Sequence, residues 1–195
     1  MRIGVPAEIK NNEHRVGLTP RSVHELCSTG QIVNVQSKAG SAIGFSDEDY
    51  QQAGATLLSS ASEVYDSSDL IVKVKEPLPE EFRFLSPEKT LFTYLHLAGN
   101  KSQALELIET GVTGIAYETV TSSDGSLPLL APMSKIAGQI SIVVGQYFLL
   151  KPNGGIGTIL GSVENIERRV VTVIGAGVAG TEAIKKAIAN DAHLK

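Results

Sequence analysis

The chain has 195 residues, of which 42% are hydrophobic, and it carries a net charge of −4 at pH 7 with a mean hydropathy of +0.06. This composition is typical of a globular protein with a core of its own, while the acidic balance and the lack of a basic cluster argue against a nucleic-acid partner. The single cysteine, Cys27, excludes a disulfide framework within the chain, and the apolar stretch 136–150 is too short to span a bilayer. We therefore predict a cytoplasmic protein with no membrane partner.

The first third of the chain alternates between strand and helix patterns. In chain order we predict a strand at 2–5, a polar loop at 8–15, a helix that Thr19 and Pro20 open and Gly30 ends, a strand at 32–35, a helix at 46–52 capped by Ser46, and a short helix at 61–65.

The pattern continues with strands at 70–75, 90–95 and 112–117, and with a helix from a Ser102 cap to residue 110. Strands that alternate with helices predict a parallel sheet with helices on both faces. We assign residues 1–128 to one α/β domain of Rossmann-like character.

Residues 129–195 are predicted to form a connecting helix and the start of a second Rossmann domain. Ser134 is expected to cap an apolar helix over 135–150, which needs burial against the body of the protein or another subunit. The glycine-rich stretch 151–157 is interpreted as a connector, with a phosphate cradle as the alternative.

The strongest motif of the chain is GAGVAG at 175–180. It follows the β-branched run 170–174 and precedes the helix formers 181–189, an order typical of a dinucleotide-binding turn. Gly175 makes the turn, Gly177 admits a pyrophosphate and Gly180 allows close packing, although a purely structural glycine turn is the alternative. Residues 193–195 are too short for a second strand, so we expect the strand at 170–174 to lack a neighbour.

Three cationic or protonatable residues follow predicted strands. Arg15 lies after the first strand, Lys75 ends the strand at 70–75 and His96 follows the strand at 90–95. Ligands of parallel α/β sheets bind beyond the carboxyl ends of the strands, so these groups predict a site for a small carboxylate with a reacting carbonyl. A solvated strand end and a structural histidine are the alternatives, and the spacing of the four histidines predicts no metal site.

Several long motifs follow one another through the whole chain: GVPAEIKNNEHRVGLTP at 4–20, LIVKVKEP at 70–77, TYLHLA at 93–98, AYETV at 116–120, LPLLAPMS at 127–134 and the GAGVAG turn. Together they resemble the alanine dehydrogenase and pyridine-nucleotide transhydrogenase family, with the best fit to its alanine dehydrogenases.

The resemblance implies roles for individual residues. Arg15 and Lys75 match substrate-holding positions and His96 matches the catalytic acid/base. The matched contacts of the cofactor NAD are Ser134, Gly175, Gly177, Val178, Ala179 and Gly180. The implied reaction is the reversible oxidative deamination of L-alanine to pyruvate and ammonium, carried out by a homo-hexamer.

Members of this family are nearly twice as long, so the resemblance implies a truncated form that is inactive alone. The acidic residue that decides between NAD and NADP, and the catalytic aspartate, would lie beyond Lys195. Alternatives are a transhydrogenase alpha-type subunit, a related amino-acid dehydrogenase such as carboxyethylornithine synthase, and a non-catalytic remnant that associates with a full-length subunit.

Overall fold

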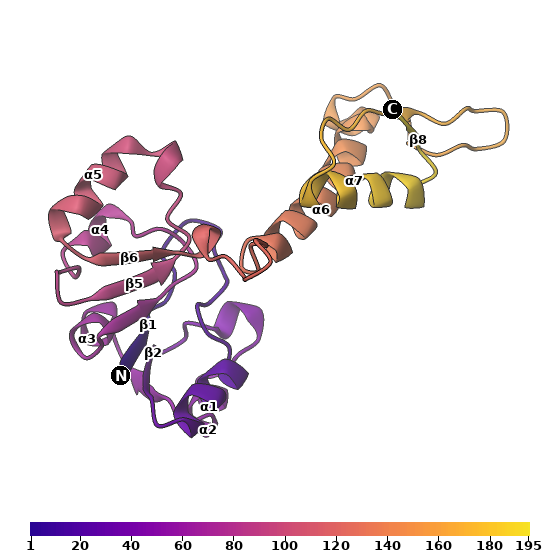
Figure 1. Cartoon of the computed structure of the whole chain (residues 1–195). Coiled ribbons are helices and arrows are strands. Elements are labelled where there is room, and N and C mark those ends of the chain that lie inside the picture. The colour runs from indigo at the N-terminus through magenta and orange to yellow at the C-terminus, as the bar shows by residue number, and fades with distance from the viewer. The chain divides into compact units, whose positions relative to one another are not determined.

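The computed structural model describes all 195 residues, which form two compact units, Met1–Val120 and Thr121–Lys195 (Figure 1). The first unit contains, in chain order, β1 (Arg2–Val5), α1 (Pro20–Ser28), β2 (Ile32–Gln36), α2 (Asp47–Gln52), β3 (Thr56–Leu58), α3 (Ala61–Asp66), β4 (Leu70–Val72), α4 (Pro79–Phe82), β5 (Thr90–Thr93), α5 (Lys101–Thr110) and β6 (Thr113–Ala116). Short 3₁₀ turns lie at Ser41–Ile43, Leu97–Gly99 and Tyr117–Thr119.

The six strands of this unit form one parallel sheet in the order β3-β2-β1-β4-β5-β6. This is the strand order of a doubly wound Rossmann sheet, so the predicted α/β class is confirmed. The first strand lies in the centre, where Ile3 is level with Leu70 of β4 and with Val33 of β2. The order reverses between β1 and β4, and such a switch point leaves a crevice beyond the carboxyl ends of the two strands.

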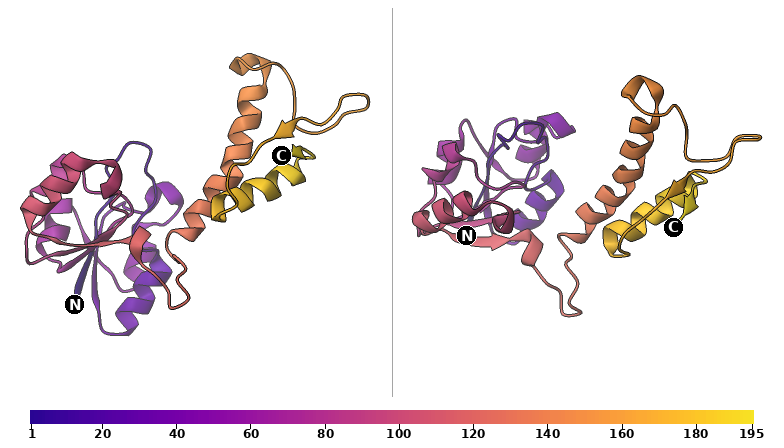
Figure 2. Two further views of the ribbon diagram at one scale, coloured as in Figure 1. Left: turned by 45° about the horizontal axis from the view of Figure 1, so that its top comes forward. Right: turned by 90° about the horizontal axis from the view of Figure 1, so that it is seen from above.

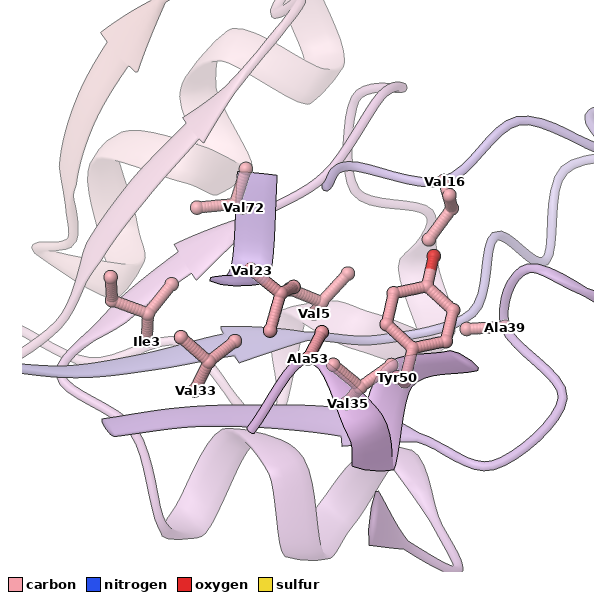
Figure 3. Packing of buried hydrophobic residues seen from close by; sticks show 10 residues of the cluster. All are labelled: Ile3, Val5, Val16, Val23, Val33, Val35, Ala39, Tyr50, Ala53 and Val72. Carbon is pink, nitrogen blue, oxygen red and sulfur yellow. The ribbon is translucent and has the colours of Figure 1, made fainter. Parts of the chain in front are cut away.

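Helices cover both faces of the sheet, as Figure 2 shows. On one face, Val23 of α1 and Tyr50 of α2 pack against inward-pointing valines of β1 and β2 (Figure 3). On the other face, Tyr65 of α3 and Leu107 of α5 pack against Ile71 of β4 and Leu91 of β5. Because strand side chains alternate between faces, β4 contributes to both clusters: Leu70 and Val72 pack on the first face and Ile71 packs on the second.

Several boundaries differ from the sequence-based expectation. The strands predicted at 70–75 and 90–95 end earlier, at Val72 and Thr93. The cap of α5 is Asn100, whose side chain accepts from the Gln103 N–H, while Ser102 lies within the helix. The short strand β3 and the single turn α4 were not predicted.

The second unit consists of α6 (Ala131–Leu149), β7 (Val170–Val171), α7 (Val178–Ala189) and β8 (His193–Leu194), with a 3₁₀ turn at Lys151–Asn153. The prediction that 193–195 is too short for a strand is wrong: β8 pairs in parallel with β7, with Val170 beside His193. The prediction that Ser134 caps the long helix is also wrong, because α6 begins at Ala131 with a proline in its first turn.

The two helices of this unit lie side by side in all views and pack through small residues (Figures 1 and 2). A Cβ on Gly138 of α6 would lie 2.1 Å from the Ala179 carbonyl oxygen of α7, so only glycine permits this approach. Within the unit α6 buries only Gly138 and Ile142, so its predicted burial is only partly realised. None of the helices combines the length and apolar character that crossing a bilayer demands.

Candidate substrate edge and cofactor turn

The loop that follows β1 crosses the end of β4 at the switch point. A Cβ on Gly17 would lie 2.4 Å from the Val72 carbonyl oxygen, so the loop rests directly on that strand end. The Tyr50 hydroxyl donates to the Leu18 carbonyl at 2.8 Å and fixes the same segment from α2. Arg15, two residues before Gly17, is thereby held beside the carboxyl ends of β1 and β4.

Arg15 is oriented by Glu13. Its Nε and one terminal nitrogen donate to the two carboxylate oxygens at 2.8 and 2.5 Å, and its backbone N–H donates to the same group at 3.0 Å. These hydrogen bonds lower the pKa of Glu13 to about 2 against the opposing effect of burial, and they raise the pKa of Arg15. The guanidinium is therefore a fixed cation, and 39% of its side chain is exposed to an incoming ligand.

Lys75 lies just beyond β4 on the same edge. Its backbone N–H donates to Glu8 at 3.3 Å and its carbonyl accepts from the Thr93 hydroxyl at 2.9 Å, so the chain is held from both sides. The Lys75 charge also contributes, as the smallest of the causes, to the lowered pKa of Glu13, so the Lys75 ammonium lies within electrostatic range of the Glu13–Arg15 pair. The structure thus brings these two predicted residues together.

His96 is exposed and adopts an unusual backbone conformation just beyond β5. Its φ of 51° and ψ of 31° are left-handed, a region that costs energy for a residue other than glycine. The Glu118 carboxylate holds this turn, because it accepts the His96 N–H at 2.7 Å and the Leu95 N–H at 3.2 Å. The turn borders a hollow of about 410 Å³ whose lining includes Leu97, Ala116 and Thr119.

Tyr94 connects Arg15 with His96. Its ring stacks on the imidazole, with centroids 5.8 Å apart and planes 13° from parallel. Burial raises the pKa of Tyr94, and the Arg15 charge acts in the opposite direction, so the guanidinium lies near the phenol. Two cations and an exposed imidazole therefore share one edge of the first unit, an arrangement that can attract a carboxylate and exchange protons with it.

Sequence reasoning missed the residues that support this edge, among them Glu8, Tyr94 and Glu118. Glu8 fell in a segment interpreted as a polar loop, although its side chain is 2% exposed. One signal was available: Lys73 lies between two valines in an apolar strand, and a buried ammonium requires a carboxylate partner. The structure provides two such partners, Glu8 and Glu81.

The glycine turn lies in the second unit, between β7 and α7. Gly175 has a φ of +96°, which favours glycine, and a Cβ on Gly180 would lie 2.0 Å from the Gly175 carbonyl oxygen. Gly177 precedes the first residue of α7, and a Cβ there would meet nothing within 4 Å. The turn therefore leaves open space at a helix N-terminus that no side chain caps and no acidic residue of the first turn occupies.

This geometry fits the pyrophosphate of a dinucleotide. The first backbone N–H groups of α7, including those of Val178 and Ala179, have no partner in the helix and form the positive end of its dipole. Ser134 lies in the first turn of α6, where its N–H donates to the Leu130 carbonyl at 3.1 Å.

Together these features define a class of protein: a doubly wound α/β unit with a cationic edge, followed by a unit whose glycine turn opens a helix in the manner typical of dinucleotide-binding folds. Residues 4–137 match the alanine dehydrogenase/PNT N-terminal domain, and residues 141–195 match the corresponding C-terminal domain. The chain therefore belongs to the alanine dehydrogenase/PNT family.

Individual relatives agree with this assignment. An alanine dehydrogenase of Staphylococcus epidermidis is 48% identical over 194 residues, which are 100% of this chain and 52% of that protein. A solved L-alanine dehydrogenase structure matches with a TM-score of 0.89 and 48% identity over 98% of this chain and 53% of that one. A transhydrogenase from Sinorhizobium meliloti shares the fold, with a TM-score of 0.81 and 24% identity over 100% of this chain and 55% of that one. The chain thus spans about half the length of the relatives it matches.

Proposed function

We propose that the chain carries the substrate edge and the cofactor turn of an NAD-dependent alanine dehydrogenase. The reaction is the reversible oxidative deamination of L-alanine to pyruvate and ammonium. The observation that carries this proposal is the gathering of Arg15, Lys75 and His96 at one edge of the sheet, which Glu13 and Tyr94 link. Relatives at 48% identity that are named alanine dehydrogenase support the choice of substrate.

Each residue of the edge has one task in this proposal. Arg15 offers a planar fork of donors to the substrate carboxylate, and Lys75 offers a compact charge to the amino or oxo group. His96 takes a proton from the water that adds to the iminium carbon and returns protons in the reverse direction. The stacked Tyr94 ring keeps the imidazole in place, so less conformational entropy is lost when the reactive geometry is reached.

The cofactor is proposed to bind at Gly175, Gly177, Val178, Ala179 and Gly180, with Ser134 as a further contact. When bound, NAD supplies the acceptor for the hydride that leaves Cα of the substrate. The open helix N-terminus at Gly177 supports this placement, since the two phosphates need N–H donors and room beside the backbone.

A homo-hexamer in the cytoplasm is the assembly and location we propose. The exposed apolar face of α6 supports association with further copies of the chain, because Ile136, Ile140, Val143 and Phe148 are each at least half exposed.

Pyruvate binding by the 195-residue chain tests the proposal. We expect Arg15→Ala to weaken pyruvate binding in calorimetry at least about tenfold, because the carboxylate loses its bidentate partner. Arg21→Ala is the matched control, since Arg21 is an exposed arginine of α1 that pairs only with Glu25. The 195-residue chain alone is expected to form no NADH from L-alanine, because it spans about half the length of the relatives it matches. Pyruvate binding should therefore also serve as the readout for the second pair, and it should weaken in His96→Gln and not in His24→Gln. A chain that binds no pyruvate, or binding that ignores Arg15, contradicts the proposal.

A further inference from the structure

A buried ionic network lies directly beneath the substrate edge. Lys73 is fully buried and its ammonium lies 2.6 Å from Glu81 and 3.3 Å from Glu8. The Tyr65 hydroxyl donates to the Glu81 carboxylate at 3.1 Å, which ties α3 to the same group. Buried charges persist only when they are paired and hydrogen-bonded, and every member of this network is.

Glu8 has a second set of contacts that reaches the site. One of its carboxylate oxygens accepts the Val74 N–H at 2.6 Å and the Lys75 N–H at 3.3 Å. These N–H groups lie beyond the last paired residue of β4, where the ladder with β1 has already ended. The carboxylate thus takes over the role of a strand neighbour and sets the path of the chain at Lys75.

We infer that Glu8 is a positioning residue for Lys75, an inference that rests on the proposed function of this edge. Its carboxylate fixes the backbone that carries the substrate-binding ammonium, and its bond to Lys73 anchors that carboxylate in the core. The Thr93 hydroxyl, bonded to the Lys75 carbonyl at 2.9 Å, holds the opposite side. Glu8 itself does not touch the substrate, because it is 2% exposed.

Two conservative variants separate positioning from charge. Glu8→Gln keeps an acceptor oxygen at the same reach and loses the charge. Glu8→Asp keeps the charge and withdraws the oxygen from the Val74 and Lys75 N–H groups. If Glu8 positions Lys75, Glu8→Asp weakens pyruvate binding about tenfold while Glu8→Gln stays within about threefold of the unaltered chain. The reverse order of the two variants would overturn the inference.

A double-mutant cycle tests whether Glu8 acts through Lys75. In a Lys75→Met background, Glu8→Asp should change pyruvate affinity less than about twofold, since the group it positions is gone. An undiminished loss in that background contradicts the inference.

A measurement without substrate separates this inference from the proposed function. We expect the amide resonances of Val74 and Lys75 to move in Glu8→Asp and to stay near their original positions in Glu8→Gln. If those resonances do not move in Glu8→Asp, the inference fails even where pyruvate binds. If the unaltered chain binds no pyruvate, the proposed function fails while the amide resonances still decide the position of Lys75.

Discussion

The two units of the chain differ in how their apolar residues are used. The first unit has two clusters of buried side chains, one on each face of a six-stranded sheet. The second unit has one cluster of five buried hydrophobic residues, three of which are alanine, and leaves Ile174 96% exposed beside a two-stranded sheet. An apolar sequence is therefore not enough to form a large core. The first unit forms its core because helices cover its six-stranded sheet, whereas the second unit has no sheet covered in this way.

The largest effect should come from the buried charge of the first unit. Lys73→Met leaves Glu8 and Glu81 as unpaired buried carboxylates, which we expect to cost about 3–5 kcal/mol of unfolding free energy. Lys185→Met in the second unit removes an exposed pair with Glu182 and should change stability by less than about 1 kcal/mol. Urea unfolding followed by circular dichroism measures both. Equal losses of unfolding free energy in the two variants would show that the burial of Lys73 does not make its ion pairs more important for stability than the exposed pair.

A matched pair of leucines tests the cores directly. Leu91→Ala, in the interior strand β5, should destabilise the first unit by about 2–5 kcal/mol because its neighbours on the sheet cannot collapse into the cavity. Leu160→Ala, in a loop against α7, should cost less because the thin cluster around it relaxes more easily. Proton NMR during urea titration follows each unit separately. A larger loss of stability in Leu160→Ala than in Leu91→Ala would contradict the view that the first unit has the better-packed core.

The glycine turn separates stability from ligand binding. At Gly177 an added methyl group meets no protein atom, so Gly177→Ala should leave the melting temperature unchanged. The same methyl group occupies the space proposed for the pyrophosphate, so NAD affinity should fall at least about tenfold, or 1.4 kcal/mol. Saturation-transfer NMR with NAD measures the affinity. An unchanged affinity for NAD would contradict the proposal that the cofactor binds at this turn.

The smallest effect concerns pH. The pKa of Glu13 is about 2, below its ordinary 4.5, because Arg15 hydrogen-bonds the ionised form. A lowered pKa stabilises the fold above pH 4.5, and this contribution is lost as the pH falls from 4.5 toward 2. Glu13→Gln should therefore cost about 1 kcal/mol at pH 7, after allowance for solvent screening, and should flatten the acid limb of stability.

The control for this pH effect is Glu25→Gln, because Glu25 pairs with Arg21 on the exposed surface of α1. It should leave the acid limb unchanged. If Glu13→Gln also leaves that limb unchanged in urea titrations between pH 2 and 7, the Arg15 contact does not stabilise the ionised carboxylate.

The sequence predicted the alternating α/β pattern and the clustering of Arg15, Lys75 and His96 because these depend on local patterns and on one rule about strand ends. It did not predict Glu8 or Glu118, because their partners are backbone N–H groups that lie far away in the sequence. No local signal predicts the left-handed conformation of His96, which a distant carboxylate maintains.

The errors at helix starts have a common cause. Asn100 and Ser102 are both good capping residues, and the helix began at the earlier one. At α6 the proline in the first turn marks the helix start better than Ser134 does, because a helix tolerates proline only in its first turn. The two-residue strand β8 was dismissed for its length, but two parallel pairs with β7 suffice here.

The central place of β1 has a consequence for the order of folding. This strand leaves the ribosome before its neighbours in the sheet, and its neighbour on one side, β4, begins only at Leu70. The β2 side can pair early, whereas the other edge of β1 stays open until the chain has grown past that strand, and open strand edges invite association. The ion pair between Arg2 and Asp69, at 2.5 Å, lies where β1 meets the start of β4 and is one of the contacts that form only once this edge is paired.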